Sequence, residues 1–268
     1  MKAAQFSEYG GPEVIQVVEA DKPTPMENQV LVEVHDSSIN PFDTSIRAGY
    51  MKEMIPLELP VTLGGDIAGE VIEIGSDVSG FAVGDKVYGQ ANVVAGNSGA
   101  FAQFSATKAE QVAIMPSNLD YLESASLPLV GASALQALTQ HINLQPGQKI
   151  FIHGGGGGIG TIAIQIAKNI GAHIATTATG EQIELVKKLG ADEVIDYKSA
   201  DFSEVLSDYD AAFDTVGGEE FTKTFNILKS GGVAVSMIAE VDEAKASERG
   251  ISAFPQQTHV TTKVLDEL

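Results

Sequence analysis

Residues 151–160 read FIHGGGGGIG, five consecutive glycines followed by isoleucine and a sixth glycine. Glycine loses more backbone entropy on folding than any other residue, so a run this dense needs a specific role. Its surroundings indicate one. Residues 149–153 are typical of a short buried strand, and apolar residues recur with helical spacing over 159–170, before Gly171 ends the pattern. The run is therefore predicted to be the turn between a strand and a helix.

Within this turn, Gly155, Gly157 and Gly160 have the spacing of dinucleotide-binding glycines. One such glycine permits the tight turn, one lets a pyrophosphate approach the backbone, and one lets helix and strand pack closely. Gly158 and Ile159 lie in the same turn, where exposed N–H groups and the helix dipole favour an anion. Strand patterns alternate with helical patterns after the turn, which predicts a Rossmann fold with a doubly wound parallel sheet.

The glycine run has three other interpretations. A P-loop needs Gly-Lys-Ser/Thr at its end, but Thr161 follows Gly160 with no lysine between them. Gly154, Gly158 and Gly160 fit the short-chain dehydrogenase spacing, yet no tyrosine has a lysine four residues later. A glycine-rich turn that binds nothing is the remaining, purely structural alternative.

The composition limits the class of protein. The chain has 268 residues, 44% of them hydrophobic, which is enough for about two domains. Because 36 Asp+Glu outnumber 16 Lys+Arg, phosphate backbones and anionic membranes would be repelled, and we expect no nucleic-acid or membrane partner. Cysteine is absent, which excludes disulfides and Cys-ligated zinc. The N-terminus lacks the apolar core of a signal peptide, so we expect a cytoplasmic protein.

Two sequence patterns meet near the middle of the chain. Up to about residue 115, short β-like runs alternate with Gly, Pro, Asp and Asn turn signals, and from Leu119 helical patterns begin. We therefore predict an all-β domain over residues 1–118 and an α/β domain over residues 119–268.

Four motifs carry a resemblance to a known family: SINPFDTSIRAGY (38–50), GEVIEIGSDVSGFAVGDKVYG (69–89), SLPLVGASALQAL (126–138) and HGGGGGIG (153–160). Together they resemble the zinc-free quinone oxidoreductase branch of the medium-chain dehydrogenase/reductase superfamily, over nearly the whole chain. The resemblance implies an α/β fold, with a GroES-like β domain joined to a Rossmann domain and the active site in the cleft between them. Relatives continue past the motif TTKVLDEL (261–268) to complete the first domain, so we expect that return to be absent here.

The resemblance also indicates whether the protein binds zinc and which reaction it catalyses. Zinc-dependent relatives carry a cysteine where this chain has Asn40-Pro41, and a His-Glu pair where it has Gly65-Asp66. We therefore expect no zinc, and without a Lewis acid alcohol dehydrogenation is disfavoured. Reduction of a quinone or an α,β-unsaturated carbonyl such as an enone is favoured instead. The alternative is an NADPH-binding sensor or structural protein with negligible turnover.

The end of the second Rossmann strand bears on the choice of cofactor. NAD enzymes place a carboxylate about 20 residues past the glycines, but residues 176–179 are Thr-Thr-Ala-Thr. NADP(H) is therefore predicted, and NAD(H) is less favoured. The resemblance implies that Tyr197 contacts the 2′-phosphate, although Gln182 stands where relatives have a lysine. The predicted cofactor-binding residues are Ser133, Gly155, Gly157, Gly158, Ile159, Gly160, Thr177, Thr179 and Tyr197.

The predicted catalytic residues, Asn40, Asp43 and Tyr50, come from the resemblance. Asn40 is a donor to the acceptor carbonyl or, alternatively, a turn-forming residue before proline. Asp43 is expected to pair with Arg47 four residues later, and Tyr50 to line the acceptor pocket or donate a proton. His153 is expected to be structural. The resemblance also implies a possible homodimer.

Overall fold

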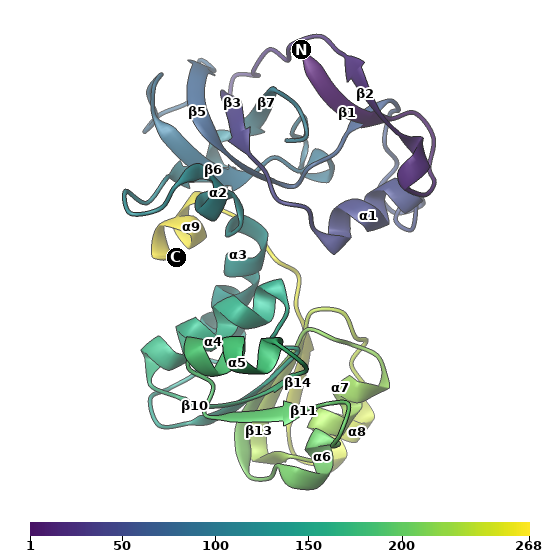
Figure 1. The fold of residues 1–268 in the computed structure, drawn as a ribbon, viewed down its shortest axis with the longest axis vertical. Coiled ribbons are helices and arrows are strands. Elements are labelled where there is room, and N and C mark those ends of the chain that lie inside the picture. The colour runs from purple at the N-terminus through teal and green to yellow at the C-terminus, as the bar shows by residue number, and fades with distance from the viewer. The chain divides into compact units, whose positions relative to one another are not determined.

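The computed structural model describes all residues, 1–268, and its contacts divide the chain into two compact units (Figure 1). Unit 1 comprises Met1–Leu129 and Val260–Leu268, and unit 2 comprises Val130–His259. The division after Leu129 differs from the predicted boundary at residues 118/119. The reason is that the first helix beyond that boundary, α2 (Tyr121–Ala125), packs on strands of unit 1 instead of starting the second unit.

Unit 1 is built on two antiparallel sheets, one with the strand order β7-β3-β5-β6-β8 and one with the order β2-β1-β4. Valine and isoleucine side chains from the inner faces of the larger sheet form its core, as the predicted β-like runs require. The strands are β1 (Lys2–Phe6), β2 (Ile15–Glu19), β3 (Gln29–Asp36), β4 (Val61–Thr62), β5 (Asp66–Ile74), β6 (Lys86–Gln90), β7 (Phe104–Lys108) and β8 (Val112–Ile114).

The C-terminal residues return to unit 1, contrary to the expectation that such a return is absent. Helix α9 (Thr262–Glu267), yellow in Figure 1, packs against β8. Its contacts are specific: the Tyr88 hydroxyl donates to the Leu265 carbonyl at 2.6 Å, and the Thr262 hydroxyl donates to the Val112 carbonyl at 2.7 Å. These bonds were not foreseeable from TTKVLDEL alone, because their partners lie far away in the sequence.

Unit 2 is a six-stranded sheet with the order β11-β10-β9-β12-β13-β14, and every pairing in it is parallel. This confirms the predicted Rossmann-type sheet and the α/β class. The strands are β9 (Lys149–His153), β10 (His173–Ala178), β11 (Glu193–Asp196), β12 (Tyr209–Asp214), β13 (Leu228–Ser236) and β14 (Ser252–Pro255).

Helices cover both faces of this sheet (Figure 1). One apolar cluster joins the sheet to α4 and α5, and a second, richer in phenylalanine, joins its other face to α6, α7 and α8. No helix of the structure combines the length and the apolar character needed to cross a bilayer. The remaining helices are α1 (Pro41–Ala48), α3 (Pro128–Gln136), α4 (Gly158–Ile170), α5 (Gln182–Leu189), α6 (Phe202–Val205), α7 (Glu219–Thr224) and α8 (Glu243–Glu248).

Candidate functional site

The glycine run forms the predicted turn between β9 and α4, and the space around it explains why glycine is needed. A Cβ atom on Gly155 would lie 2.0 Å from the Thr176 hydroxyl oxygen, and a Cβ on Gly160 would lie 2.3 Å from the Gly154 carbonyl oxygen. Neither distance is possible for a real side chain. Gly155 therefore lets the turn pass close to β10, and Gly160 lets α4 pack closely against the turn.

The N-terminus of α4 presents unpaired backbone donors. The first hydrogen bond into this helix is donated by Thr161 N–H to the Gly157 carbonyl, and no side chain caps Gly157. The N–H groups of Gly158, Ile159 and Gly160 precede that bond and have no helical acceptor. With the helix dipole they make an anion-binding site that fits a pyrophosphate. The glycine turn thus has the space and the donors that a dinucleotide requires.

The end of β10 lies directly beside this turn. Gly154 donates its N–H to the Thr177 hydroxyl at 2.9 Å, and Gly155 donates to the Thr177 carbonyl at 3.0 Å. Thr177 is buried, so its side chain holds the turn in place, and Thr179 is the half-buried residue that follows the strand. The end of this strand offers hydroxyl groups and no carboxylate.

Tyr197 follows β11, whose last residue, Asp196, pairs in register with Ala178 of β10. Because the strands are parallel, Tyr197 and Thr179 leave the sheet at the same edge. Tyr197 is 56% exposed and can contact a ligand there. The Gln182 side-chain amide instead donates to the Gly156 carbonyl at 3.2 Å, so the residue at the position of the relatives' lysine is turned toward the glycine turn.

Ser133 lies on α3 and is fully buried. Its hydroxyl is 2.7 Å from the Thr258 hydroxyl, and its carbonyl accepts a hydrogen bond from Gln256 Nε2 at 2.8 Å. These bonds tie α3 to the segment after β14 within unit 2. The predicted role of Ser133 beside the nicotinamide stays a prediction.

A buried carboxylate, Asp214, organises the loops at the same edge of the sheet. It lies 2.9 Å from His153 Nδ1, accepts a 2.6 Å bond from the Ser236 hydroxyl, and accepts backbone N–H bonds from Val216 and Gly217. Burial raises the pKa of Asp214, but these hydrogen bonds outweigh burial and hold its pKa below the ordinary value. Asp214 therefore links the ends of three strands, β9, β12 and β13, and His153 has a structural partner.

In unit 1, Asn40 is a buried hydrogen-bond donor at the start of α1. Its Nδ2 donates to Asp66 Oδ2 at 2.8 Å and to the Ser38 hydroxyl at 3.1 Å. Both hydrogens of the amide are thereby used, and the side chain is 7% exposed. Donation from Asn40 to an acceptor carbonyl would require one of these bonds to be exchanged.

Asp43 does not form the expected pair with Arg47. Its carboxylate accepts the Asn40 N–H at 2.8 Å, closing the first turn of α1, while Arg47 Nε donates to the Gly10 carbonyl at 3.2 Å. Burial raises the pKa of Asp43, and backbone donors offset part of that effect. The prediction from the four-residue spacing was wrong because the backbone N–H at the start of α1 binds the Asp43 carboxylate instead.

Tyr50 lies beyond the C-terminal end of α1, whereas Asn40 lies at its N-terminal end. Eight residues of helix separate them by about 12 Å. Tyr50 is 81% exposed. Within unit 1 the two residues are therefore not neighbours, and the role of Tyr50 at an acceptor stays a prediction.

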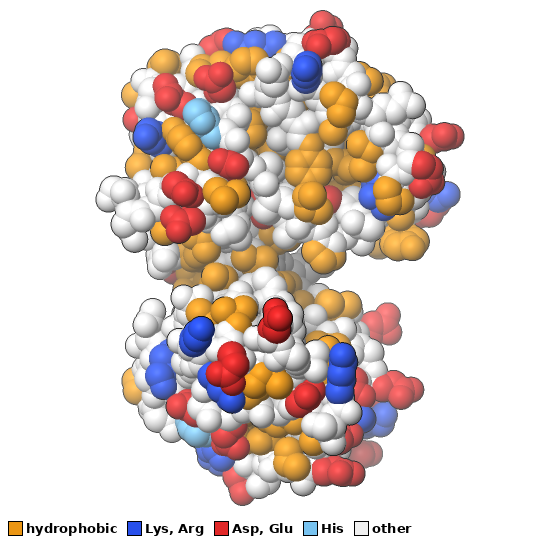
Figure 2. Space-filling model, in the orientation of Figure 1, with side chains coloured by type: hydrophobic (Ala, Val, Ile, Leu, Met, Phe, Trp, Pro, Cys, Tyr) orange, Lys and Arg blue, Asp and Glu red, His pale blue; other side chains and the backbone are white.

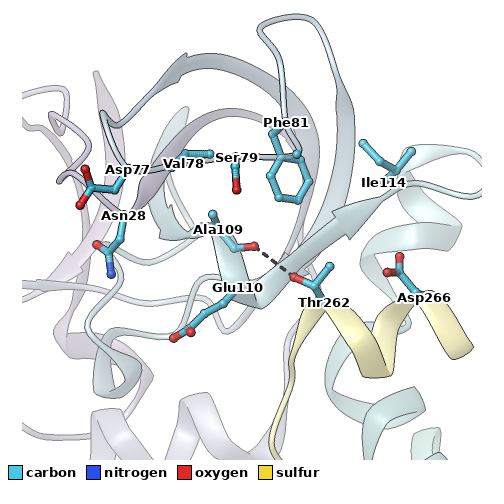
Figure 3. A pocket seen from close by; sticks show the side chains of 11 residues that line it. Asn28, Asp77, Val78, Ser79, Phe81, Ala109, Glu110, Ile114, Thr262 and Asp266 are labelled. Atoms are coloured by element: carbon cyan, nitrogen blue, oxygen red, sulfur yellow. Dashed lines mark hydrogen bonds between the residues drawn. The ribbon is translucent and has the colours of Figure 1, made fainter.

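A pocket of about 450 Å³ lies elsewhere in unit 1, between the Asp77–Phe81 segment, β8 and α9 (Figure 3). Three carboxylates, those of Asp77, Glu110 and Asp266, line it and would repel the phosphates of a dinucleotide. Acidic side chains are also spread widely over the visible surface of both units (Figure 2). The uncapped N-terminus of α4 is thus the better candidate for a negatively charged ligand.

Comparison with known proteins is consistent with this geometry. The family described as "Alcohol dehydrogenase GroES-like domain" matches residues 26–117, and the family described as "Zinc-binding dehydrogenase" matches residues 158–258. The chloroplast envelope quinone oxidoreductase homolog of Arabidopsis thaliana is 36% identical over 247 residues, which cover 88% of this chain and 74% of that protein. The chain belongs to the medium-chain dehydrogenase/reductase superfamily. Its relatives place it in the quinone oxidoreductase branch.

Further members of the superfamily extend the comparison. The 2-methylene-furan-3-one reductase of Solanum lycopersicum is 34% identical, and the match covers 90% of this chain but 63% of that relative. The quinone oxidoreductase of Coxiella burnetii superposes with a TM-score of 0.91 at 34% identity, covering 100% of this chain and 86% of that one. The Escherichia coli quinone oxidoreductase, solved as a complex with NADPH, has a TM-score of 0.87 at 29% identity. The match covers 100% of this chain and 85% of that one. This chain therefore spans less than two thirds of some curated superfamily members that it matches.

Despite the name of the second matching family, no group of three or more His, Cys, Asp or Glu side chains is arranged to hold a metal ion. Two of the best-connected polar residues, Asp66 and Asp214, were not among the predicted site residues. Asp66 was noted only as a replaced ligand position, and Asp214 was not considered. A carboxylate at the end of a predicted buried strand is the signal that could have identified Asp214.

Proposed function

We propose that the chain is an NADPH-dependent reductase that reduces a quinone or an α,β-unsaturated carbonyl without zinc. The observation that carries the proposal is the uncapped N-terminus of α4 beside a β10 strand that ends without a carboxylate. When bound, NADPH supplies the hydride. The N–H groups of Gly158, Ile159 and Gly160 would hold its pyrophosphate, and the Thr177 hydroxyl keeps the turn in position.

The choice of acceptor rests on the superfamily relatives. They include proteins named quinone oxidoreductase homolog and NADPH-dependent alkenal/one oxidoreductase, and these names refer to quinones and to unsaturated aldehydes and ketones. Asn40, Asp43 and Tyr50 are our candidates for the acceptor side, and Asn40 would orient the carbonyl oxygen only by exchanging one of its hydrogen bonds to Asp66 and Ser38. A panel of quinones and enones, assayed by the loss of nicotinamide absorbance, tests the proposal. Absence of turnover with every member would contradict it.

The cofactor preference is a separate prediction. Calorimetry is expected to give a lower Kd for NADPH than for NADH, because Thr179 and Tyr197 offer neutral polar groups where a carboxylate would repel the 2′-phosphate. The preference should shrink as salt rises, since Tyr197 and the neighbouring Lys198 are exposed. Equal Kd values for the two cofactors at low salt would refute the preference.

One observation favours a second candidate function, an NADPH-binding sensor with negligible turnover. Both amide hydrogens of Asn40 are already used inside unit 1, which leaves this residue no spare donor for an acceptor. NADPH binding without turnover on the panel would support the sensor.

We also propose a cytoplasmic location, although relatives include chloroplastic and mitochondrial proteins. A homodimer through the edge strand β14 is a further proposal, which sedimentation as a monomer alone would contradict.

A further inference from the structure

The side chain of Asp66, at the start of β5, is a buried carboxyl group with no positively charged partner. It is 1% exposed. Its Oδ2 lies 2.6 Å from the Ser38 hydroxyl and 2.8 Å from Asn40 Nδ2, and its Oδ1 accepts the Leu129 N–H at 3.1 Å. All these neighbours are neutral. A carboxyl group in such a place favours its protonated form.

The electrostatic surroundings agree with this view. Burial, together with the nearby charge of Asp43, raises the pKa of Asp66 to about 7, even though Ser38, Asn40 and the Leu129 N–H donate to it. Asp43 comes from α1, Ser38 and Asn40 from the segment before it, and the register partner on β6 is the uncharged Gln90. No lysine, arginine or histidine forms an ion pair with Asp66.

The direction of the proton follows from which neighbours can accept it. A protonated carboxyl must donate its hydrogen, but Asn40 Nδ2 and the Leu129 N–H are donors only. The Ser38 oxygen, 2.6 Å away, is the one neighbour that can accept. That oxygen also accepts from Asn40 Nδ2 at 3.1 Å, so its two lone pairs are then filled. The hydrogen of the Ser38 hydroxyl must therefore point out of the cluster, and Ser38 is half-buried, within reach of solvent.

We propose that Asp66 and Ser38 form a proton relay that supplies the proton consumed in the reduction. The relay rests on the proposed function. When hydride adds to the β-carbon of an enone, the carbon–carbon π electrons move toward the carbonyl and leave an enolate. Ser38 gives its hydroxyl proton to the enolate and takes the proton of Asp66. The Asp66 carboxylate then regains a proton from water through the Ser38 hydroxyl, so each cycle uses one hydride and one proton.

The relay is tested by the pH dependence of turnover of a cyclic enone at saturating NADPH. The kcat of the wild-type protein should fall about tenfold per pH unit above about pH 7, as Asp66 loses its proton. Asp66→Asn and Ser38→Ala should each lower kcat by about 10²-fold at about pH 6 and abolish this descending limb. Ser38→Thr, which keeps the hydroxyl, should have the wild-type kcat at about pH 6 and the wild-type descending limb.

Ser37→Ala is the matched control, since the Ser37 hydroxyl donates to the backbone carbonyl of Asp66 at 2.6 Å and does not touch the carboxyl group. It should keep the wild-type pH profile. Thermal melts and NADPH affinity should be alike in all variants, which separates lost proton transfer from lost folding. A wild-type pH profile in Asp66→Asn, or in Ser38→Ala, would overturn the relay while leaving the reductase function intact.

A readout that needs no turnover is infrared spectroscopy of the protein without cofactor. The difference between wild type and Asp66→Asn should contain a protonated carboxyl band at about pH 6 that disappears as pH rises through about 7. Ser38→Ala should shift the frequency of that band, because the acid loses its acceptor. If the band is missing at about pH 6, Asp66 is ionised and the relay is refuted. If the wild type reduces no acceptor at all, the proposed function fails, and the relay fails with it as a catalytic device.

Discussion

Gly160→Ala is expected to lower the affinity for NADPH by about 10²-fold, equivalent to about 2.7 kcal/mol. The new Cβ would lie 2.3 Å from the Gly154 carbonyl oxygen. The Gly154 oxygen belongs to the backbone of the turn and cannot swing aside as the end of a side chain can, so α4 must move away from β9. The N–H groups at its start would then no longer converge on one anion. Overpacking should also cost about 1–3 kcal/mol of stability. Calorimetry and denaturant unfolding measure the two effects.

Gly158→Ala is the control for the stability effect. Its nearest neighbour would be Val130 Cγ1 at 3.2 Å, the end of a side chain that can shift by a few tenths of an ångström. Alanine is also a better helix former than glycine at this first position of α4. The free energy of unfolding should therefore change by less than about 0.5 kcal/mol. Wild-type affinity and stability in Gly160→Ala would show that the turn has room for a side chain.

The largest loss of stability is expected from Asp214→Ala, at about 3–5 kcal/mol. The substitution removes the acceptor of the Ser236 hydroxyl and of two backbone N–H groups, and leaves His153 without its partner. Because hydrogen bonds hold the pKa of Asp214 below its ordinary value of 3.8, its contribution is present above about pH 4. The contribution is lost as pH falls through the folded-state pKa. Denaturant unfolding should therefore give a smaller difference in the free energy of unfolding between wild type and Asp214→Ala at acid pH than at neutral pH.

Asp210→Ala on the same strand is the matched control. Asp210 lies at the start of β12, is partly exposed, pairs with Lys229 at 2.9 Å and accepts the Lys149 N–H at 2.8 Å. Surface ion pairs of this kind contribute about 1 kcal/mol or less. If Asp214→Ala cost no more than Asp210→Ala, Asp214 would not be the centre that holds the three strand ends together.

The parts of the fold that could be predicted from sequence are those governed by local rules. The glycine run with a strand before it and helical spacing after it defined β9, the turn and α4, because these contacts form within about a dozen residues. The absence of a carboxylate after the second Rossmann strand was likewise visible, in Thr177 and its neighbours. Here a short stretch of chain determines both structure and chemistry.

The parts that could not be predicted depend on long-range register. Asp66 meets Asn40 because β5 lies beside β3 in an antiparallel sheet, and a shift of one residue would turn its side chain to the other face. Asp43 was assigned to Arg47 by helical spacing, but the backbone donor at Asn40 is closer. Local spacing rules alone do not select between such partners, because the choice depends on how distant strands pair.

The return of α9 to unit 1 has a consequence for synthesis at the ribosome. Unit 2 is inserted between two segments of unit 1, and the Tyr88–Leu265 hydrogen bond joins residues 177 positions apart. The chain emerges N-terminus first, at about 5–20 residues per second. The β8 surface that receives α9 therefore stays exposed until the whole of unit 2 has been translated. Chaperones that bind exposed apolar surface would have roughly ten seconds or more to act there.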